Sequence, residues 1–103
     1  MDLFEIHNMR HPWNRADYPR PWLIVGFPPG RDVVGCFPIA TECYDGNCFY
    51  LDEDHPDFPA TGLAHSCNIH DKYVIEISGG NILNRRGELA GGLLSDFRKY
   101  SGL

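Results

Sequence analysis

The sequence has no apolar run long enough to span a bilayer, which takes about 20 consecutive apolar residues. Its first residues, MDLFEIHNMR, also lack the basic stretch followed by an apolar stretch that marks a secretory signal. No internal repeat and no tract of low complexity is present, which excludes a repeat array. We therefore expect a cytoplasmic protein with no membrane partner.

Basic residues are scarce as well. Nine Lys and Arg stand against 14 Asp and Glu, which gives a formal net charge of −5. A protein that coats duplex nucleic acid is normally basic, so this charge argues against broad DNA binding but leaves a local basic site open. The charges are uneven, because acidic side chains gather in residues 52–57 and basic ones between residues 85 and 99.

The four cysteines form no C-x-x-C pair, the spacing most typical of zinc and redox motifs. Without an export signal, we expect reduced thiols. Two alternatives stay open: disulfides, and a zinc site that combines cysteines with His65 or His70. We expect no metal and no cofactor. The cysteines are Cys36, Cys43, Cys48 and Cys67.

What the sequence does contain is enough material for one small domain. Its 103 residues can form a single core, so we expect one domain over residues 1–103. Eleven glycines and eight prolines favour short strands and turns over long helices.

Apolar runs bounded by turn residues predict five or six short strands. The two strongest runs, residues 22–27 and 33–41, flank the turn sequence PPGRD and should form a hairpin. The DGN sequence at residues 45–47 is a second hairpin signal. The polar residues 7–21 and the acidic residues 52–62 should be loops. The remaining predicted strands are residues 2–6, 49–51, 63–69 and 72–78.

The last segment has a different period. Apolar residues recur there about every 3.6 positions, which predicts an amphipathic helix over residues 88–100. Gly91 and Gly92 weaken that helix by about 1 kcal/mol each relative to alanine, and Gly102 is its expected stop. The expected fold is mainly β, a small bent antiparallel sheet or barrel with a C-terminal helix over one opening.

The sequence YPRPWLIVGF places Arg20 between two prolines at the start of a predicted strand. Proline fixes its own φ and restricts the residue before it to an extended conformation, so Arg20 has little backbone freedom. A solvated arginine at a strand edge would explain the same sequence, so this position alone does not establish a site.

Four segments together resemble one family in their order along the chain. They are RPWLIV, FPIAT, TGLAHSCNI and a segment of the form I-L-x-R-R-G-E-L that runs into the terminal helix. This ordered set resembles the MazF/PemK-like toxins, which are small bacterial endoribonucleases of type II toxin–antitoxin systems. The resemblance extends from residue 2 to residue 103 and implies a β-barrel of the SH3-like, CcdB/PemK-like kind with a C-terminal α-helix.

The resemblance also implies an activity and partners. Members of this family cleave single-stranded RNA without a metal, form homodimers and are neutralised by an antitoxin protein. Their catalytic pair, the arginine of the RP motif and a threonine that closes the next strand, falls on Arg20 and Thr41. Cys67 and Asn68 depart from the family, which often has an acidic residue followed by glutamine there.

The chemistry of RNA cleavage suits these residue types. Attack of a ribose 2′-OH on its phosphate builds negative charge on the non-bridging oxygens and gives a cyclic phosphate. A fixed guanidinium offers two parallel donors to that charge, and a threonine hydroxyl offers a third. Candidates for proton transfer or substrate binding are His7, His11, His65, Glu42 and Asn68.

Two other functions stay in view. A non-catalytic SH3-like binding module would keep the barrel and lack the chemistry, and a thiol or zinc sensor would use the cysteines. His55, in the acidic loop, and His70, at a predicted turn, are expected to be solvated. The sequence does not determine the RNA specificity, the antitoxin or the general base.

Overall fold

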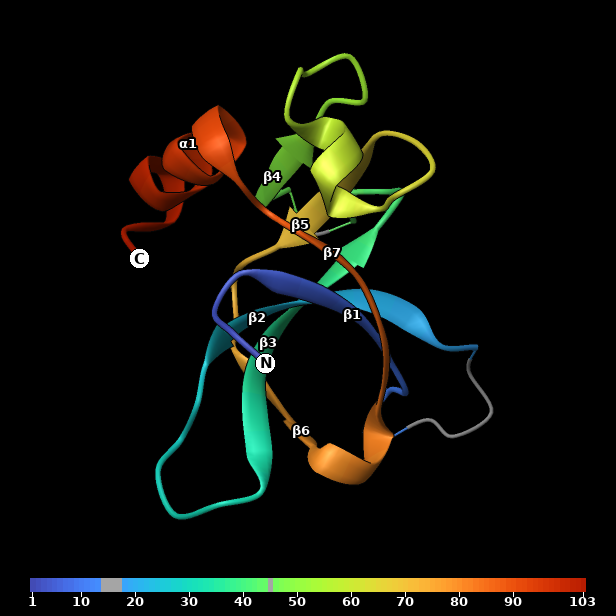
Figure 1. Ribbon diagram of the computed structural model, residues 1–103, viewed down its shortest axis with the longest axis vertical. Coiled ribbons are helices and arrows are strands. Elements are labelled where there is room, and N and C mark those ends of the chain that lie inside the picture. The colour runs from blue at the N-terminus through green and yellow to red at the C-terminus, as the bar shows by residue number, and fades with distance from the viewer. Residues whose placement is uncertain (14–17, 45) are drawn as a thin grey trace.

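The computed structural model describes residues 1–13, 18–44 and 46–103, and Figure 1 shows their arrangement. Within these residues the chain forms seven strands, two short 3-10 helices and one α-helix. In chain order they are β1 (Glu5–Met9), β2 (Arg20–Gly26), β3 (Val33–Ala40), β4 (Cys48–Leu51), η1 (Phe58–Thr61), β5 (Cys67–His70), β6 (Ile75–Ser78), η2 (Gly79–Asn81), β7 (Ile82–Glu88) and α1 (Gly91–Ser101). The predicted fold class, mainly β with a C-terminal helix, is confirmed.

The strands pair antiparallel in the order β4-β5-β3-β2-β1-β7. β3 is the central strand, because β6 pairs with its first half and β5 with its second half along the edge away from β2. Val34 lies opposite Ile77 in β6, and Ile39 lies opposite Ile69 in β5. Register shifts between β1 and β7 and at the end of β2 mark points where such a sheet bends.

The predicted hairpin between the two strongest apolar runs is confirmed as β2 and β3, in which Trp22 lies opposite Pro38. Gly30 in the connecting turn has a φ of 72°, a conformation that glycine adopts without steric cost. This register brings the first residues of β2 beside the last residues of β3. The hairpin therefore determines where the candidate site lies.

Alternation along β2 divides its apolar side chains between the two faces of the sheet. Leu23 belongs to a larger core cluster, whereas Trp22 and Ile24 belong to a smaller cluster. Leu93 and Phe97 of α1 are buried in the larger cluster, and Figure 1 shows the helix beside β4. The predicted amphipathic helix thus covers the larger core.

The first strand begins later than predicted and ends later. Phe4 has a positive φ of 67°, which interrupts the extended backbone before β1 starts at Glu5. β1 then runs to Met9, inside the segment predicted to be a loop, because it pairs with β2 and places Met9 opposite Arg20. Residues 14–17 of that predicted loop lie outside the described residues.

The predicted second hairpin is wrong, because β4 does not pair with β3. β5 lies between them, so that Ile69 has Ile39 on one side and Phe49 on the other. Asp45 of the turn signal lies outside the residues that the structure describes. β5 and β6 also begin later than predicted, at residues 67 and 75.

Sequence analysis missed β7. This strand has few apolar residues, and its extended backbone is stabilised by pairing with β1. At Gly87 a methyl group would lie 2.3 Å from the carbonyl oxygen of Ala60, so the strand packs directly on η1. The helix consequently starts at Gly91, three residues later than predicted. The predicted loop over residues 52–62 contains η1, whose Phe58 joins the larger core.

The expectation of four reduced thiols is wrong for two of them. Cys43 and Cys48 form a disulfide that closes the segment between β3 and β4, whereas Cys36 and Cys67 are free and buried. Across residues 1–13, 18–44 and 46–103, no three His, Cys, Asp or Glu side chains gather as metal ligands. In the same part of the chain, no helix is long and apolar enough to cross a membrane.

Candidate active-site pocket

A pocket of about 400 Å³ opens where β2 starts and β3 ends. Four segments far apart in the sequence supply its polar side chains, and apolar side chains such as those of Ile39 and Leu63 line the rest. The polar residues are Arg20, Thr41, His65 and Arg86. The two residues predicted to form a catalytic pair therefore line one pocket, together with one of the candidate histidines.

The β2–β3 hairpin brings Arg20 and Thr41 together. Trp22 lies opposite Pro38, so the antiparallel register carries Arg20 to the level of Ala40, next to Thr41. Both residues are exposed. A ligand that enters the pocket can therefore meet a guanidinium from one strand and a hydroxyl from the other.

Two side chains of β5 hold the backbone that follows β3. Asn68 Nδ2 donates to the carbonyl oxygen of Thr41 at 3.1 Å, and His70 Nε2 donates to the carbonyl oxygen of Glu42 at 2.8 Å. His70 is only 4% exposed, so the prediction that it is solvated is wrong. β5 extends to His70 and lies between β3 and β4, which buries this side chain.

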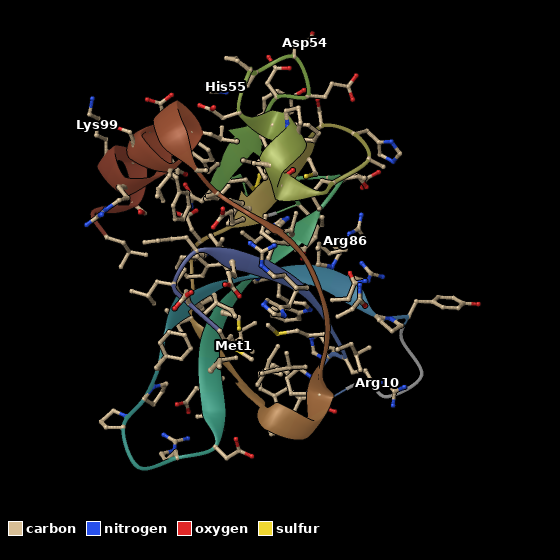
Figure 2. The ribbon with its side chains drawn as sticks, viewed as in Figure 1. Met1, Arg10, Asp54, His55, Arg86 and Lys99 are labelled. Carbon is tan, nitrogen blue, oxygen red and sulfur yellow. A yellow bond between two sulfur atoms is a disulfide. The ribbon has the colours of Figure 1, made fainter. Side chains whose placement is uncertain are left out.

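Arg86 is the pocket residue that sequence analysis did not single out. Its guanidinium donates to the carbonyl oxygen of Gly62 from Nε at 3.2 Å and from Nη2 at 3.0 Å, and Nη1 donates to Asn8 Oδ1 at 3.4 Å. Figure 2 shows Arg86 between the η1 segment and β1. The adjacent basic residues 85 and 86, followed by Gly87, were the sequence signal for this position. The signal could be interpreted only once β7 was known, because this strand places Arg86 at the pocket.

Close backbone packing explains why Arg86 reaches Gly62. Gly62 has a φ of 69°, and a methyl group there would lie 2.0 Å from the carbonyl oxygen of Arg86. Only glycine fits such an approach. The chain after η1 therefore lies against β7 and presents its carbonyl to the guanidinium.

Cys67 lines the same pocket as a protonated thiol. Burial raises its pKa to about 11, although the charge of Arg86 opposes the shift. A thiol with this pKa stays protonated at neutral pH, so Cys67 contributes apolar surface rather than acid–base chemistry.

Of the three candidate histidines, His65 alone is at the pocket. His7 is buried in β1, where its Nε2 lies 2.8 Å from Glu5 Oε1, and it lines a separate cavity of about 440 Å³. That hydrogen bond lowers the pKa of Glu5. His11 packs its ring against Trp13 and Trp22, with centroids 5.4 and 5.9 Å apart.

The remaining candidates differ in what they touch. Asn68 contacts the Thr41 backbone, while Glu42 is exposed, does not line the pocket, and accepts a hydrogen bond from His70 at its main-chain carbonyl. His55, predicted to be solvated, is half-buried, and its Nδ1 accepts a hydrogen bond from the backbone N–H of Asp57 at 3.0 Å. It belongs to the η1 loop and does not line the pocket.

The arrangement favours an anion. Two guanidinium groups and one hydroxyl line an open pocket, and no Asp or Glu side chain is among its lining residues in the described part of the chain. Arginine matches a phosphate with parallel donors, and a neighbouring hydroxyl adds another. A phosphate group is therefore a fitting ligand.

No protein-family model matches the sequence, and no curated protein matches it significantly. Among solved structures, the chain is similar to an endoribonuclease in complex with its cognate antitoxin from Mycobacterial species. The TM-score is 0.66 at 11% sequence identity, and the match covers 99% of this chain and 92% of that chain. The likeness establishes the fold.

Proposed function

We propose that this protein is an endoribonuclease toxin that cleaves single-stranded RNA, without a metal, at the pocket where β2 starts and β3 ends. The observation that carries the proposal is the meeting of Arg20, Thr41 and Arg86 at one pocket. The similarity of the fold to that of an endoribonuclease supports it. The negative net charge is compatible with it, because two arginines and no Asp or Glu of the described residues line the pocket where the scissile phosphate would bind.

In the proposed reaction, the ribose 2′-oxygen attacks phosphorus, the bond from phosphorus to the 5′-oxygen breaks, and a 2′,3′-cyclic phosphate forms. Arg20 donates two hydrogen bonds to the non-bridging oxygens, and the Thr41 hydroxyl donates one. His65 takes the proton from the 2′-hydroxyl, and solvent supplies one to the leaving 5′-oxygen. Such preorganised donors are typically worth about 3–4 kcal/mol each in a transition state.

The same surface would bind the proposed antitoxin. The similar solved structure contains an endoribonuclease with its antitoxin, and a disordered antitoxin segment that occupies the pocket would exclude RNA. Like the toxins that its sequence resembles, the protein is expected to act as a homodimer.

Cleavage of a mixed-sequence single-stranded RNA in excess EDTA tests the proposal. Arg20→Ala and Thr41→Val should lower kcat/KM at least 100-fold, and Arg20→Lys should restore little because lysine lacks the planar fork. Arg31→Ala is the matched control, since Arg31 is exposed on the β2–β3 turn and pairs with Glu76 at 2.7 Å. Products should carry a cyclic phosphate and a 5′-hydroxyl.

The same experiment separates the enzyme from a non-catalytic SH3-like module. RNA binding without cleavage by the unaltered protein would favour the module. Full activity of Arg20→Ala would contradict the catalytic assignment. Expression of the unaltered protein should arrest bacterial growth, and co-expression of the protein encoded by the adjacent gene should relieve the arrest.

A further inference from the structure

A disulfide holds the segment that leaves the pocket after Thr41. Cys43 is exposed and bonds to Cys48, the first residue of β4. β3 and β4 are not neighbours in the described sheet, because β5 lies between them. The disulfide therefore links the segment after β3 covalently to β4, a strand with which β3 shares no backbone ladder in the described sheet.

His70 is buried where this segment makes its contacts. Its Nε2 donates to the carbonyl oxygen of Glu42, and its ring stacks on Tyr44 with centroids 4.1 Å apart. Its Nδ1 lies 3.5 Å from Cys48 Sγ. Because Nε2 carries the proton that the carbonyl accepts, Nδ1 is the basic nitrogen of the neutral ring, and it lies beside the sulfur.

We infer that the Cys43–Cys48 disulfide is a site of thiol–disulfide exchange that takes dithiol reductants as substrates, and that its state sets the position of Thr41. The proposal of thiol–disulfide exchange is based on the exposure of Cys43 and on the position of His70 beside Cys48. Its effect on cleavage rests on the proposed function. The proposed RNA cleavage uses no cysteine, so the disulfide is not needed for the reaction itself. Its role is redox control of the pocket.

The exchange begins at the sulfur of Cys43, the more exposed of the two cysteines. A thiolate of the reductant attacks Cys43 Sγ and forms a mixed disulfide, while the bond to Cys48 breaks and its electron pair stays on Cys48 Sγ. Solvent gives a proton to that thiolate, and Nδ1 of His70 accepts a hydrogen bond from the resulting Cys48 thiol. The second thiolate of the reductant then displaces Cys43, so the reductant leaves as a disulfide and its two electrons remain on the cysteines.

Opening the bond loosens the Thr41 segment without releasing it fully. The hydrogen bonds from Asn68 and His70 remain, but the covalent link two residues beyond Thr41 is lost. A displacement of about 1 Å at a reacting group can lower a rate by about 100-fold. In a reducing compartment the bond opens, so oxidation would favour the active geometry.

Reduction with dithiothreitol tests the inference on the unaltered protein. Two further thiols should become reactive to iodoacetamide, hydrogen exchange should accelerate at residues 41–44, and kcat/KM for single-stranded RNA should fall threefold or more. The proposal is overturned if the disulfide opens but hydrogen exchange at residues 41–44 is unaltered and RNA cleavage changes less than twofold. Glutathione should attach to Cys43, and an adduct confined to Cys48 contradicts the direction of attack.

Two variants complete the test. Cys43→Ser with Cys48→Ser should reproduce the reduced state and ignore dithiothreitol. Cys36→Ala should keep the full response, because Cys36 is buried in the smaller core cluster. If the unaltered protein cleaves no RNA but the exchange at residues 41–44 still rises on reduction, the proposed function fails and the redox site stands.

Discussion

Arg20 reaches the pocket from a backbone with little freedom, because Pro19 and Pro21 each have a fixed φ and Pro21 also restricts Arg20 to an extended conformation. Thr41 lies on the other strand of the hairpin with its carbonyl oxygen held by Asn68. Both residues are exposed. The two groups can meet a phosphate without rearrangement of the sheet.

Asn68 is expected to act as a positioning residue. Asn68→Ala removes the hydrogen bond to the Thr41 carbonyl, which should lower the free energy of unfolding by about 1 kcal/mol and reduce kcat with little change in KM. Steady-state kinetics on RNA and urea unfolding measure the two effects. Asn81→Ala is the control, since its side-chain amide donates a hydrogen bond to the exposed Ser78 and lies outside the pocket. A rise in KM with unchanged kcat would instead assign Asn68 to substrate binding.

The two free thiols should make the fold less stable in alkali. Burial raises the pKa of Cys67 to about 11 and that of Cys36 to about 12. Above about pH 8.5 the unfolded chain loses these protons while the folded chain keeps them, so stability falls by up to about 1.4 kcal/mol per pH unit for each thiol. Urea unfolding at pH 8 and 10 measures the loss. A Cys36→Ala, Cys67→Ala protein should show a shallower pH dependence; an equal one contradicts this account.

At the scale of elements, the contact between η1 and β7 orients the second arginine. Gly87 lets β7 approach Ala60, and Gly62 lets the chain after η1 approach Arg86. Arg86 then donates to the Gly62 carbonyl. The predicted acidic loop, residues 52–62, thus orients Arg86, and residues 63–65 that follow it line the pocket.

Gly87→Ala should disrupt this contact. The added methyl would lie 2.3 Å from the Ala60 carbonyl oxygen, so η1 or β7 must move. We expect a loss of more than about 2 kcal/mol in the free energy of unfolding and a fall in RNA cleavage as Arg86 shifts. Gly80→Ala is the control, because a methyl group there meets nothing within 4 Å. Equal stability of the two variants would show that β7 and η1 are not closely packed.

The start of α1 depends on an acidic residue from the η1 loop. Asp57 Oδ2 accepts a hydrogen bond from the backbone N–H of Gly92 at 2.8 Å, and Gly91 leaves room for this carboxylate. Asp57→Ala should therefore cost about 1 kcal/mol of stability in urea unfolding. Asp54→Ala, a change to an exposed aspartate on the same loop, should cost little. If both changes have the same effect, the cap is not a source of helix stability.

At the scale of the whole molecule, a negative net charge coexists with a cationic pocket. The fold concentrates Arg20 and Arg86, which are far apart in the sequence, at one opening. The acidic residues 52–57 lie in the loop between β4 and η1. Figure 2 shows Asp54 at the end of this loop that is far from Arg86. RNA binding should therefore be local, with few phosphate contacts.

This local binding predicts a weak dependence on salt. With about two phosphates neutralised, a plot of log affinity against log salt concentration should have a slope of about −1.4 for a single strand. Arg86→Ala should reduce the slope by about 0.7, and Arg31→Ala should leave it unchanged. Fluorescence anisotropy with a labelled RNA, under conditions that prevent cleavage, measures it. A slope several times steeper would indicate an extended basic surface.

The pair proposed on the hairpin, Arg20 and Thr41, came from the family resemblance of four ordered segments. The sequence alone determined the β2–β3 hairpin and the C-terminal helix. These depend on local patterns, namely two apolar runs around a proline- and glycine-rich turn, and apolar residues with a helical period. Leu93 and Phe97 are buried as that period requires. The sequence also predicted the end of the helix at Gly102. Its φ of 77° is typical of a glycine that ends a helix.

Only the tertiary structure decided the rest of the pocket. β7 has no strand pattern of its own and forms because β1 offers it a partner, and this pairing is what brings Arg86 to the site. The insertion of β5 between β3 and β4 buries His70 and allows Asn68 to hold Thr41. Pairing between strands distant in sequence depends on backbone hydrogen bonds, which every residue except proline can donate, so side-chain identity does not encode it.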